Sequence, residues 1–247
     1  MMLNNIKKMS FNKTLLIDVG NSYTKFAIVT NKRFKIFRYK TTTNLTFLNN
    51  KFKNYQNINK IYIVATSKID YLYSMLVKKY PHAYIKVINR DDFTNKLNLT
   101  NVDKKVVIGS DILLLGWWCS KQANLNVVIC LGTVYFAIIM QNNKYKSILL
   151  IPSITKGLEQ ISNITSIDHK LIPNYFYHCN LLNTPSCFSN GVNLLLDGFL
   201  TNIIKKYKLT SSQVVITGGD ANKYQCLKKY KIINDLTLRA LEKFIKK

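Results

Sequence analysis

The sequence predicts an α/β fold that occurs twice, with two α/β halves around a cleft. Each half contains three apolar stretches typical of consecutive strands, followed by alternating helices and strands. The chain has 247 residues, of which 47% are hydrophobic, so it can bury a sizeable core. We expect the halves to span residues 1–123 and 124–247.

In the first half, an apolar run begins at Thr14, ends at Gly20 and resumes at Lys25 as a second strand. The basic segment 33–39 alternates polar and apolar residues, which is typical of a third strand. Periodicity further predicts strands at 60–65 and 84–88 and helices at 69–79 and 111–121.

The second half repeats this layout. Strands are predicted at 126–131, 134–140, 144–151 and 213–217. Helices are predicted at 154–163, 191–206, 221–229 and 235–245. In both halves a tight polar loop follows the first strand, which makes these two loops the first candidates for a binding site.

The net charge is +24, from 36 Lys or Arg residues and 12 Asp or Glu residues. Only four of the cations are arginines, the residue best suited to bidentate contacts with phosphate and guanine. The lysines are spread along the chain among many Asn, Ile and Tyr residues, which AT-rich codons favour. We therefore expect no specific nucleic-acid partner, and a charge-driven nucleic-acid binder is the alternative.

The longest apolar stretch, 127–140, is shorter than the roughly 18 residues needed to cross a bilayer. The five cysteines contain no CxxC pair, and the histidines His82, His169 and His178 share no metal-ligand spacing. These features predict a cytoplasmic protein without a membrane partner, a disulfide framework or a histidine-based metal site.

The loop at 18–22 has the sequence Asp-Val-Gly-Asn-Ser. Gly20 lets backbone amides approach an anion closely, and Asn21 and Ser22 can donate to phosphate oxygens. Asp18 can hold a Mg²⁺ ion that bridges nucleotide phosphates, and Lys25 adds a cation. An ordinary hairpin turn explains the same residues without a ligand.

Three later features are also candidates for a ligand-binding or catalytic site. Residues 130–133 (CLGT) occupy the equivalent place in the second half, and 217–221 (TGGDA) follow a predicted strand. The paired Gly218 and Gly219 would let a flat ligand such as adenine lie against the backbone. Asp111 lies in an apolar stretch, where a carboxylate needs a partner or a function, and it suits both a general base and a helix N-cap.

In this order the loops resemble the phosphate-1, phosphate-2 and adenosine motifs of the actin-like ATPase superfamily, whose halves have a ribonuclease-H-like fold. Within that superfamily the chain resembles the type III pantothenate kinases. The matching segments are DVGNSYTKFAIV (18–29), IGSD (108–111), GT (132–133), NT (183–184), SNGVNLLLDGFLTNI (189–203) and TGGDA (217–221).

The resemblance implies ATP-dependent phosphorylation of pantothenate to 4'-phosphopantothenate, the first step of coenzyme A biosynthesis. It also implies a homodimer that uses Mg²⁺ and a monovalent cation, K⁺ or NH₄⁺, with Asp111 as the general base. Its ATP-binding positions are Asp18, Val19, Gly20, Asn21, Ser22, Tyr23, Thr24, Lys25 and Thr133. Its substrate positions are Gly109, Ser110, Asp111, Ile112 and Thr184, and its adenosine positions are Gly218 and Gly219.

Several positions depart from the family pattern. Ile112 replaces an arginine, and Cys130 replaces the aspartate with which the family binds the monovalent cation. The family's threonine and aspartate after its Gly-Thr-Ala motif are replaced by aromatic and aliphatic residues, Tyr135, Phe136 and Ile138. Because the nucleotide motifs are better preserved than the substrate and cation motifs, a catalytically impaired relative with a regulatory or binding role is the alternative hypothesis.

Overall fold

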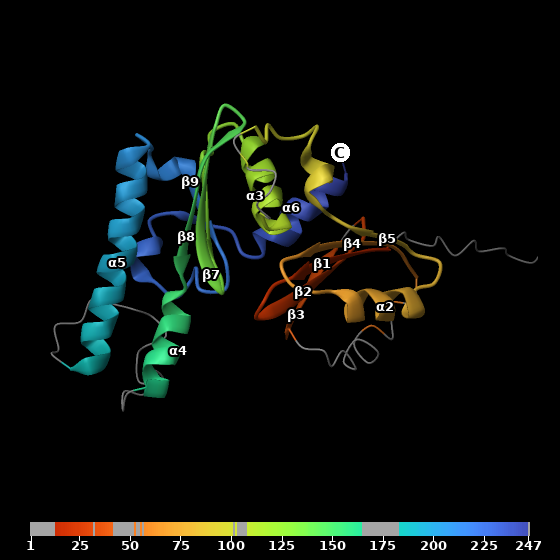
Figure 1. Ribbon diagram of the computed structural model, residues 1–247, viewed down its shortest axis with the longest axis horizontal. Coiled ribbons are helices and arrows are strands. Elements are labelled where there is room, and N and C mark those ends of the chain that lie inside the picture. Colours follow the sequence, from red (N-terminus) through yellow and green to blue (C-terminus); the bar gives the residue numbers. More distant parts are fainter. Residues whose placement is uncertain are drawn as a thin grey trace, which may run out of the picture. The chain divides into compact units, whose positions relative to one another are not determined.

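The computed structural model describes residues 13–31, 33–41, 52, 55, 57–100, 102, 108–164 and 183–246. They belong to two compact units, each built around one five-stranded sheet (Figure 1). The first unit takes in residues 1–90, 109–111 and 241–247, and the second takes in 91–108 and 112–240. The division of the chain at residue 123 stays a prediction.

The first sheet has the strand order β3-β2-β1-β4-β5. Its strands are β1 (Lys13–Val19), β2 (Tyr23–Val29), β3 (Phe34–Lys40), β4 (Ile58–Ala65) and β5 (Tyr84–Val87). The first three strands form an antiparallel meander, and β4 and β5 continue the sheet in parallel with β1.

The second sheet has the equivalent order, β8-β7-β6-β9-β10. Its strands are β6 (Val127–Leu131), β7 (Val134–Gln141), β8 (Lys144–Pro152), β9 (Val214–Thr217) and β10 (Lys231–Ile232). The first three again form an antiparallel meander, and β9 and β10 add in parallel to β6. The repeated order confirms the predicted duplicated, ribonuclease-H-like α/β fold.

In the first unit, helix α2 (Asp70–Lys79) covers one face of the sheet. Leu72 and Leu76 have the four-residue spacing that places side chains on one face of a helix, and they pack in a core with Ile17 and Ile63. Successive side chains of a strand point to opposite faces, so Asp18 projects from the face that α2 leaves uncovered. The core therefore decides on which face of the sheet the charged residues lie.

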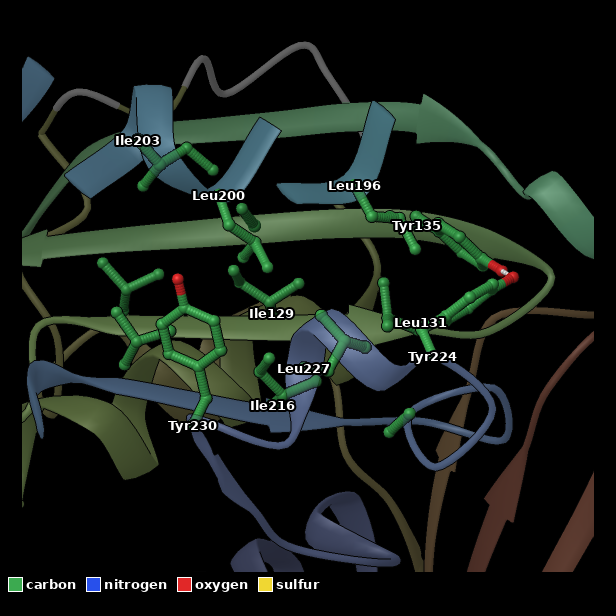
Figure 2. Close-up of a cluster of buried hydrophobic side chains, with 14 of the residues drawn as sticks. Ile129, Leu131, Tyr135, Leu196, Leu200, Ile203, Ile216, Tyr224, Leu227 and Tyr230 are labelled. Atoms are coloured by element: carbon green, nitrogen blue, oxygen red, sulfur yellow. Dashed lines mark hydrogen bonds between the residues drawn. The ribbon is translucent and has the colours of Figure 1, made fainter. Parts of the chain in front are cut away.

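In the second unit, helix α5 (Thr184–Lys206) packs its buried residues Leu196, Leu200 and Ile203 onto the sheet (Figure 2). The helix begins well before the predicted start at residue 191. Asn183 caps it by accepting a hydrogen bond from the Ser186 amide, and a proline follows in the first turn.

The remaining helices are α3 (Ser110–Ser120), α4 (Ile154–Ile164) and α6 (Leu236–Ile245), with 3₁₀ turns at Arg90–Phe93, Ser211–Gln213 and Gln225–Leu227. No helix in the described part of the chain is both long and apolar enough to cross a membrane.

The predicted helix at 221–229 is wrong. Consecutive turns occupy this segment, closed by hydrogen bonds from the Lys223 amide to Asp220 and from the Leu227 amide to Tyr224. Tyr224 is only 1% exposed, and its hydroxyl is bonded to that of Tyr135. Tertiary packing of this tyrosine overrides the local helical periodicity.

Candidate nucleotide and acceptor site

The β1–β2 loop is a tight turn closed by a hydrogen bond of 3.1 Å from the Gly20 amide to the Tyr23 carbonyl. Thr66, directly after β4, donates to the Val19 carbonyl from its amide (3.0 Å) and from its hydroxyl (3.2 Å). Thr41, directly after β3, donates its hydroxyl to the Gly20 carbonyl at 2.6 Å. These threonines donate hydrogen bonds to the Val19 and Gly20 carbonyls. The carbonyl oxygens, which would repel a phosphate, therefore point toward the protein.

Three charged residues form a row across one face of the first sheet, opposite the face on which α2 packs. Asp18 of β1 lies directly opposite Lys25 of β2, and Lys25 lies opposite Arg38 of β3. Side chains opposite each other on neighbouring strands point to the same face, with Cβ atoms about 4.5–5.5 Å apart. The Arg38 guanidinium also lies 5.8 Å from the centre of the Tyr23 ring. Arg38, Thr41 and Thr66 were not identified from the sequence.

Asp111 lies at the same end of the first sheet as this loop. Ser110 anchors the first turn of α3 to β4, because its hydroxyl accepts from the Ala65 amide (3.3 Å) and donates to the Ala65 carbonyl (3.1 Å). Ala65 is the register partner of Val19, the last residue of β1. The structure thus brings Gly109, Ser110 and Asp111 to the strand ends from which the β1–β2 loop leaves.

The surroundings of Asp111 favour a carboxylate held in one orientation. Its Oδ1 atom is buried, and the residue lies in the first turn of α3, where the helix dipole stabilises a negative charge. A Cβ atom on Gly109 would collide with Oδ1, so a side chain at Gly109 would push this carboxylate out of its present orientation. A role of Asp111 at the N-terminus of the helix and a role as general base are therefore compatible.

In the second unit, the predicted phosphate-2 and adenosine loops are adjacent. Gly218 has a φ of 108°, and a side chain there would collide with the backbone of Leu131 at the end of β6. The Asp220 amide donates to the Leu131 carbonyl at 3.0 Å. The loop that contains Thr133 and the loop that contains Gly219 therefore leave the sheet side by side.

Thr184 lines an apolar groove of about 650 Å³ in the second unit. The groove lies between α4 and the start of α5, and its walls include Ile154, Phe188, Val192 and Leu195. The exposed thiol of Cys187 also lines it. A groove of this size and polarity suits the apolar part of a small ligand, with Asn183 and Thr184 as polar groups among the lining residues.

The predicted site residues thus form two groups, one in each unit. The first unit contains Asp18–Lys25 with Gly109–Asp111, and the second contains Ile112, Cys130, Thr133, Thr184, Gly218 and Gly219. His169 and His178 lie outside the described residues. Within the described residues, no three His, Cys, Asp or Glu side chains gather as metal ligands.

This arrangement fits Mg²⁺ but not the monovalent cation. Mg²⁺ is commonly held by one or two carboxylates together with substrate phosphates, and Asp18 at a strand end can fill that role. K⁺ prefers hard oxygen ligands. Cys130 is a half-buried thiol between Phe136 on β7 and Thr217 on β9, so it is a soft substitute for a carboxylate.

Comparison with known proteins decides the family. A sequence profile of the type III pantothenate kinases matches residues 14–206. The chain belongs to this family. Relatives named type III pantothenate kinase include one from Malacoplasma penetrans, 26% identical over 84% of this chain and 86% of the relative. Another, from Mycoplasma mobile, is 23% identical over 93% of this chain and 97% of the relative.

Solved structures agree on the fold of this pantothenate kinase family member. A Campylobacter jejuni protein described as a candidate Baf family transcriptional activator has a TM-score of 0.54 and 20% identity, covering 94% of this chain and 97% of that one. A candidate N-acetylmannosamine kinase from Listeria monocytogenes has a TM-score of 0.52 and 12% identity, covering 95% and 99%. Both cover nearly the whole chain, which supports the actin-like ATPase architecture for both units.

Proposed function

We propose that this protein transfers the γ-phosphoryl group of ATP to the primary hydroxyl of pantothenate, giving 4'-phosphopantothenate and ADP. One observation carries the proposal: the first unit holds Asp111 on the end of β4, beside the strand end from which the phosphate loop leaves. Phosphoryl transfer needs a base for the attacking hydroxyl and a cradle for the phosphates at one place.

In this mechanism Asp111 accepts the proton of the attacking hydroxyl while the new O–P bond forms and the bond to ADP breaks. Its fixed orientation over Gly109 aligns the hydroxyl, which is the larger part of what such a base contributes. Lys25 and Arg38 place positive charge in the row beside Asp18, where phosphate oxygens would lie. Bound Mg²⁺, held through Asp18, supplies further neutralisation of the phosphate charge.

The groove that contains Thr184 supports pantothenate as the acceptor. Pantothenate has a branched dimethyl centre beside its hydroxyls, which suits the apolar wall formed by Phe188, Val192 and Leu195. The Thr184 hydroxyl can bond a polar group of the substrate at the edge of this wall.

The groove also provides a direct test of acceptor binding, because the exposed Cys187 lines it. Bound pantothenate should slow the alkylation of Cys187 by iodoacetamide, followed by peptide mass spectrometry. Cys119 is the internal control, since burial raises the pKa of its thiol to about 12 and leaves almost no thiolate at pH 8. Equal alkylation of Cys187 with and without saturating pantothenate would contradict this acceptor site.

A homodimer is part of the proposal. The large apolar side chains exposed in the described part of the second unit are Val134 on β7 (45%), Leu150 on β8 (61%), Ile164 on α4 (81%), and Leu194 (73%) and Leu195 (56%) on α5. Leu194 and Leu195 are neighbours on one helix, and adjoining exposed apolar side chains are typical of protein–protein interfaces. Leu194→Glu should convert a dimer into a monomer in light scattering, and an unchanged mass would contradict this interface.

The activity itself is tested by measuring ADP release with and without pantothenate in a coupled assay, together with mass detection of 4'-phosphopantothenate. Release that depends on pantothenate supports the proposal. ATP hydrolysis that pantothenate does not stimulate would contradict the assignment of the acceptor.

A second candidate function is a regulatory or binding protein that retains the family fold without efficient catalysis. Ile112 and Cys130 favour it, because they remove a cation and a carboxylate that the family uses. The Campylobacter relative in fold, described as a transcriptional activator, gives the same suggestion. Sequence-selective DNA binding with a steep salt dependence, in the absence of pantothenate turnover, would favour this candidate.

A further inference from the structure

A buried polar cluster lies beside the two loops of the second unit. Tyr135 at the start of β7 and Tyr224 after β9 are 0% and 1% exposed, and their hydroxyl oxygens are 2.7 Å apart (Figure 2). Thr155 of α4 lies 3.3 Å from the Tyr224 hydroxyl. Buried hydroxyls are costly unless they are bonded, so this cluster has to be satisfied internally.

The carboxylate of Asp220 is the end point of the cluster. Tyr135 donates to its Oδ2 atom at 2.8 Å, and Lys223 contacts its Oδ1 atom at 2.8 Å. The Asp220 side chain is 13% exposed, and its backbone amide is bonded to Leu131. Both carboxylate oxygens thus have a partner within the protein, and one of these partners, Tyr135, lies outside the 217–221 loop.

The number of protons on each hydroxyl group determines which residue donates and which accepts in this chain of hydrogen bonds. A phenol has one proton, and that of Tyr135 is donated to Asp220, so Tyr224 must donate to Tyr135. Thr155, whose hydroxyl lies 3.3 Å from that of Tyr224 and 3.5 Å from that of Tyr135, must then donate to one of these two phenols. All three donors point toward the carboxylate, an arrangement in which each bond polarises and strengthens the next. Burial, together with the charge of Asp220, raises the pKa of Tyr135 above its ordinary value, so it remains a donor at neutral pH.

We propose that Tyr135 and Tyr224 are positioning residues for nucleotide binding, acting through Asp220 on the loop that contains Gly218 and Gly219. The inference rests on the proposed function, which assigns that loop to adenosine. A loop held in place before binding loses less conformational freedom when the nucleotide arrives. The hydrogen-bonded chain holds the loop in place through Tyr135, Tyr224 and Thr155, none of which belongs to the 217–221 loop itself.

The test measures the affinity of the full-length protein for Mg²⁺·AMPPNP by calorimetry. Tyr135→Phe should raise its Kd roughly tenfold, because a hydrogen bond to a charged group is lost and Asp220 is released. Tyr224→Phe, one bond further from the carboxylate, should raise it about threefold. The matched control is Tyr145→Phe, a phenol 4% exposed in the same unit, whose hydroxyl lies 3.3 Å from the carbonyls of Ile112 and Leu113.

A merely structural role would lower the melting temperature of Tyr135→Phe and Tyr145→Phe alike and leave both nucleotide affinities unchanged. The inference is overturned if Tyr135→Phe raises the Kd no more than the control. If Tyr135→Phe does not fold, Tyr224→Phe and Asp220→Asn decide by the same comparison. Nucleotide binding by the wild type without phosphorylation of pantothenate overturns the proposed acceptor alone, whereas no nucleotide binding overturns both.

Discussion

At the end of β1 the first sheet places Asp18 opposite Lys25, whereas at the equivalent point of β6 the second sheet places Cys130 opposite Phe136. The parallel neighbours differ in the opposite sense, since Asp18 is paired with the apolar Val64 and Cys130 with the hydroxyl-bearing Thr217. The strand order is the same in both sheets. The two units therefore share their strand order but differ in the chemistry of the side chains at equivalent strand ends.

The difference indicates two ways of building a binding loop on one scaffold. In the first unit the loop is held by threonine hydroxyls, and charged side chains lie in a row on one face of the sheet. In the second unit the carboxylate of Asp220 pairs with Lys223 and accepts a hydrogen bond from Tyr135. The loop of the first unit is thus suited to bind charged groups of a ligand through side chains. The 217–221 loop is suited to contact a ligand through its backbone, which these bonds hold in one conformation.

The largest expected effect is that of Asp111→Asn in the first unit. The variant should bind ATP nearly as the wild type does, while kcat falls roughly 10²–10⁴-fold, because an amide cannot accept the hydroxyl proton. Asp70→Asn is the control, since Asp70 also lies in the first turn of a helix in this unit. Steady-state kinetics check the prediction, and a wild-type kcat for Asp111→Asn would rule out this base.

The second prediction compares equivalent strand ends. Asp18→Ala should raise the Kd for ATP about tenfold or more in the presence of Mg²⁺ and much less with EDTA, because it removes the carboxylate that we propose as the Mg²⁺ ligand. Cys130→Ala, at the equivalent position of β6, should change the same Kd less than about twofold. Calorimetric titrations of both variants test the difference, and equal effects would contradict the division between the units.

The third prediction uses neighbouring glycines. No atom lies within 4 Å of a Cβ built on Gly219, so Gly219→Leu should fold normally and raise the Kd for ATP about tenfold by filling the space of adenine. Gly218→Ala should instead destabilise the protein by about 1–3 kcal/mol or more, because its φ of 108° disfavours any side chain. Chemical denaturation and nucleotide titration separate the effects, and unchanged ATP affinity in Gly219→Leu would contradict the adenosine assignment.

The fold and part of the site could be predicted from local signals. Apolar periodicity located most of the helices and strands, and the polar loop at 18–22 and the isolated Asp111 predicted two segments that the structure brings to the same end of the first sheet. Residues such as Arg38 and Thr66 were missed because their role depends on strand register and on chain reversal, which local patterns do not encode. The wrong helix at 221–229 has the same origin, since Tyr224 is held by a residue 89 positions away.

The fourth prediction concerns Arg38, whose place in the charged row only the register reveals. Arg38→Ala should raise the Kd for ATP about two- to fivefold at low salt, with the effect fading at high ionic strength, because exposed charges are screened. Arg33→Ala, at the far end of the same sheet, is the matched control. An effect of Arg38→Ala that matches the control at every salt concentration would remove Arg38 from the site.

The smallest expected effect concerns the monovalent cation. Because the Cys130 thiol is a soft and weak ligand for K⁺, the initial rate of the wild type should change less than about twofold when K⁺ replaces tetramethylammonium at constant ionic strength. Cys130→Asp places a carboxylate at the strand end that is equivalent to that of Asp18, and it should introduce or increase activation by K⁺. Cys130→Asn is the control, because it adds an oxygen without the charge. Strong K⁺ activation of the wild type would mean that the cation is bound elsewhere in the protein, and the second unit would then use charge as the first does.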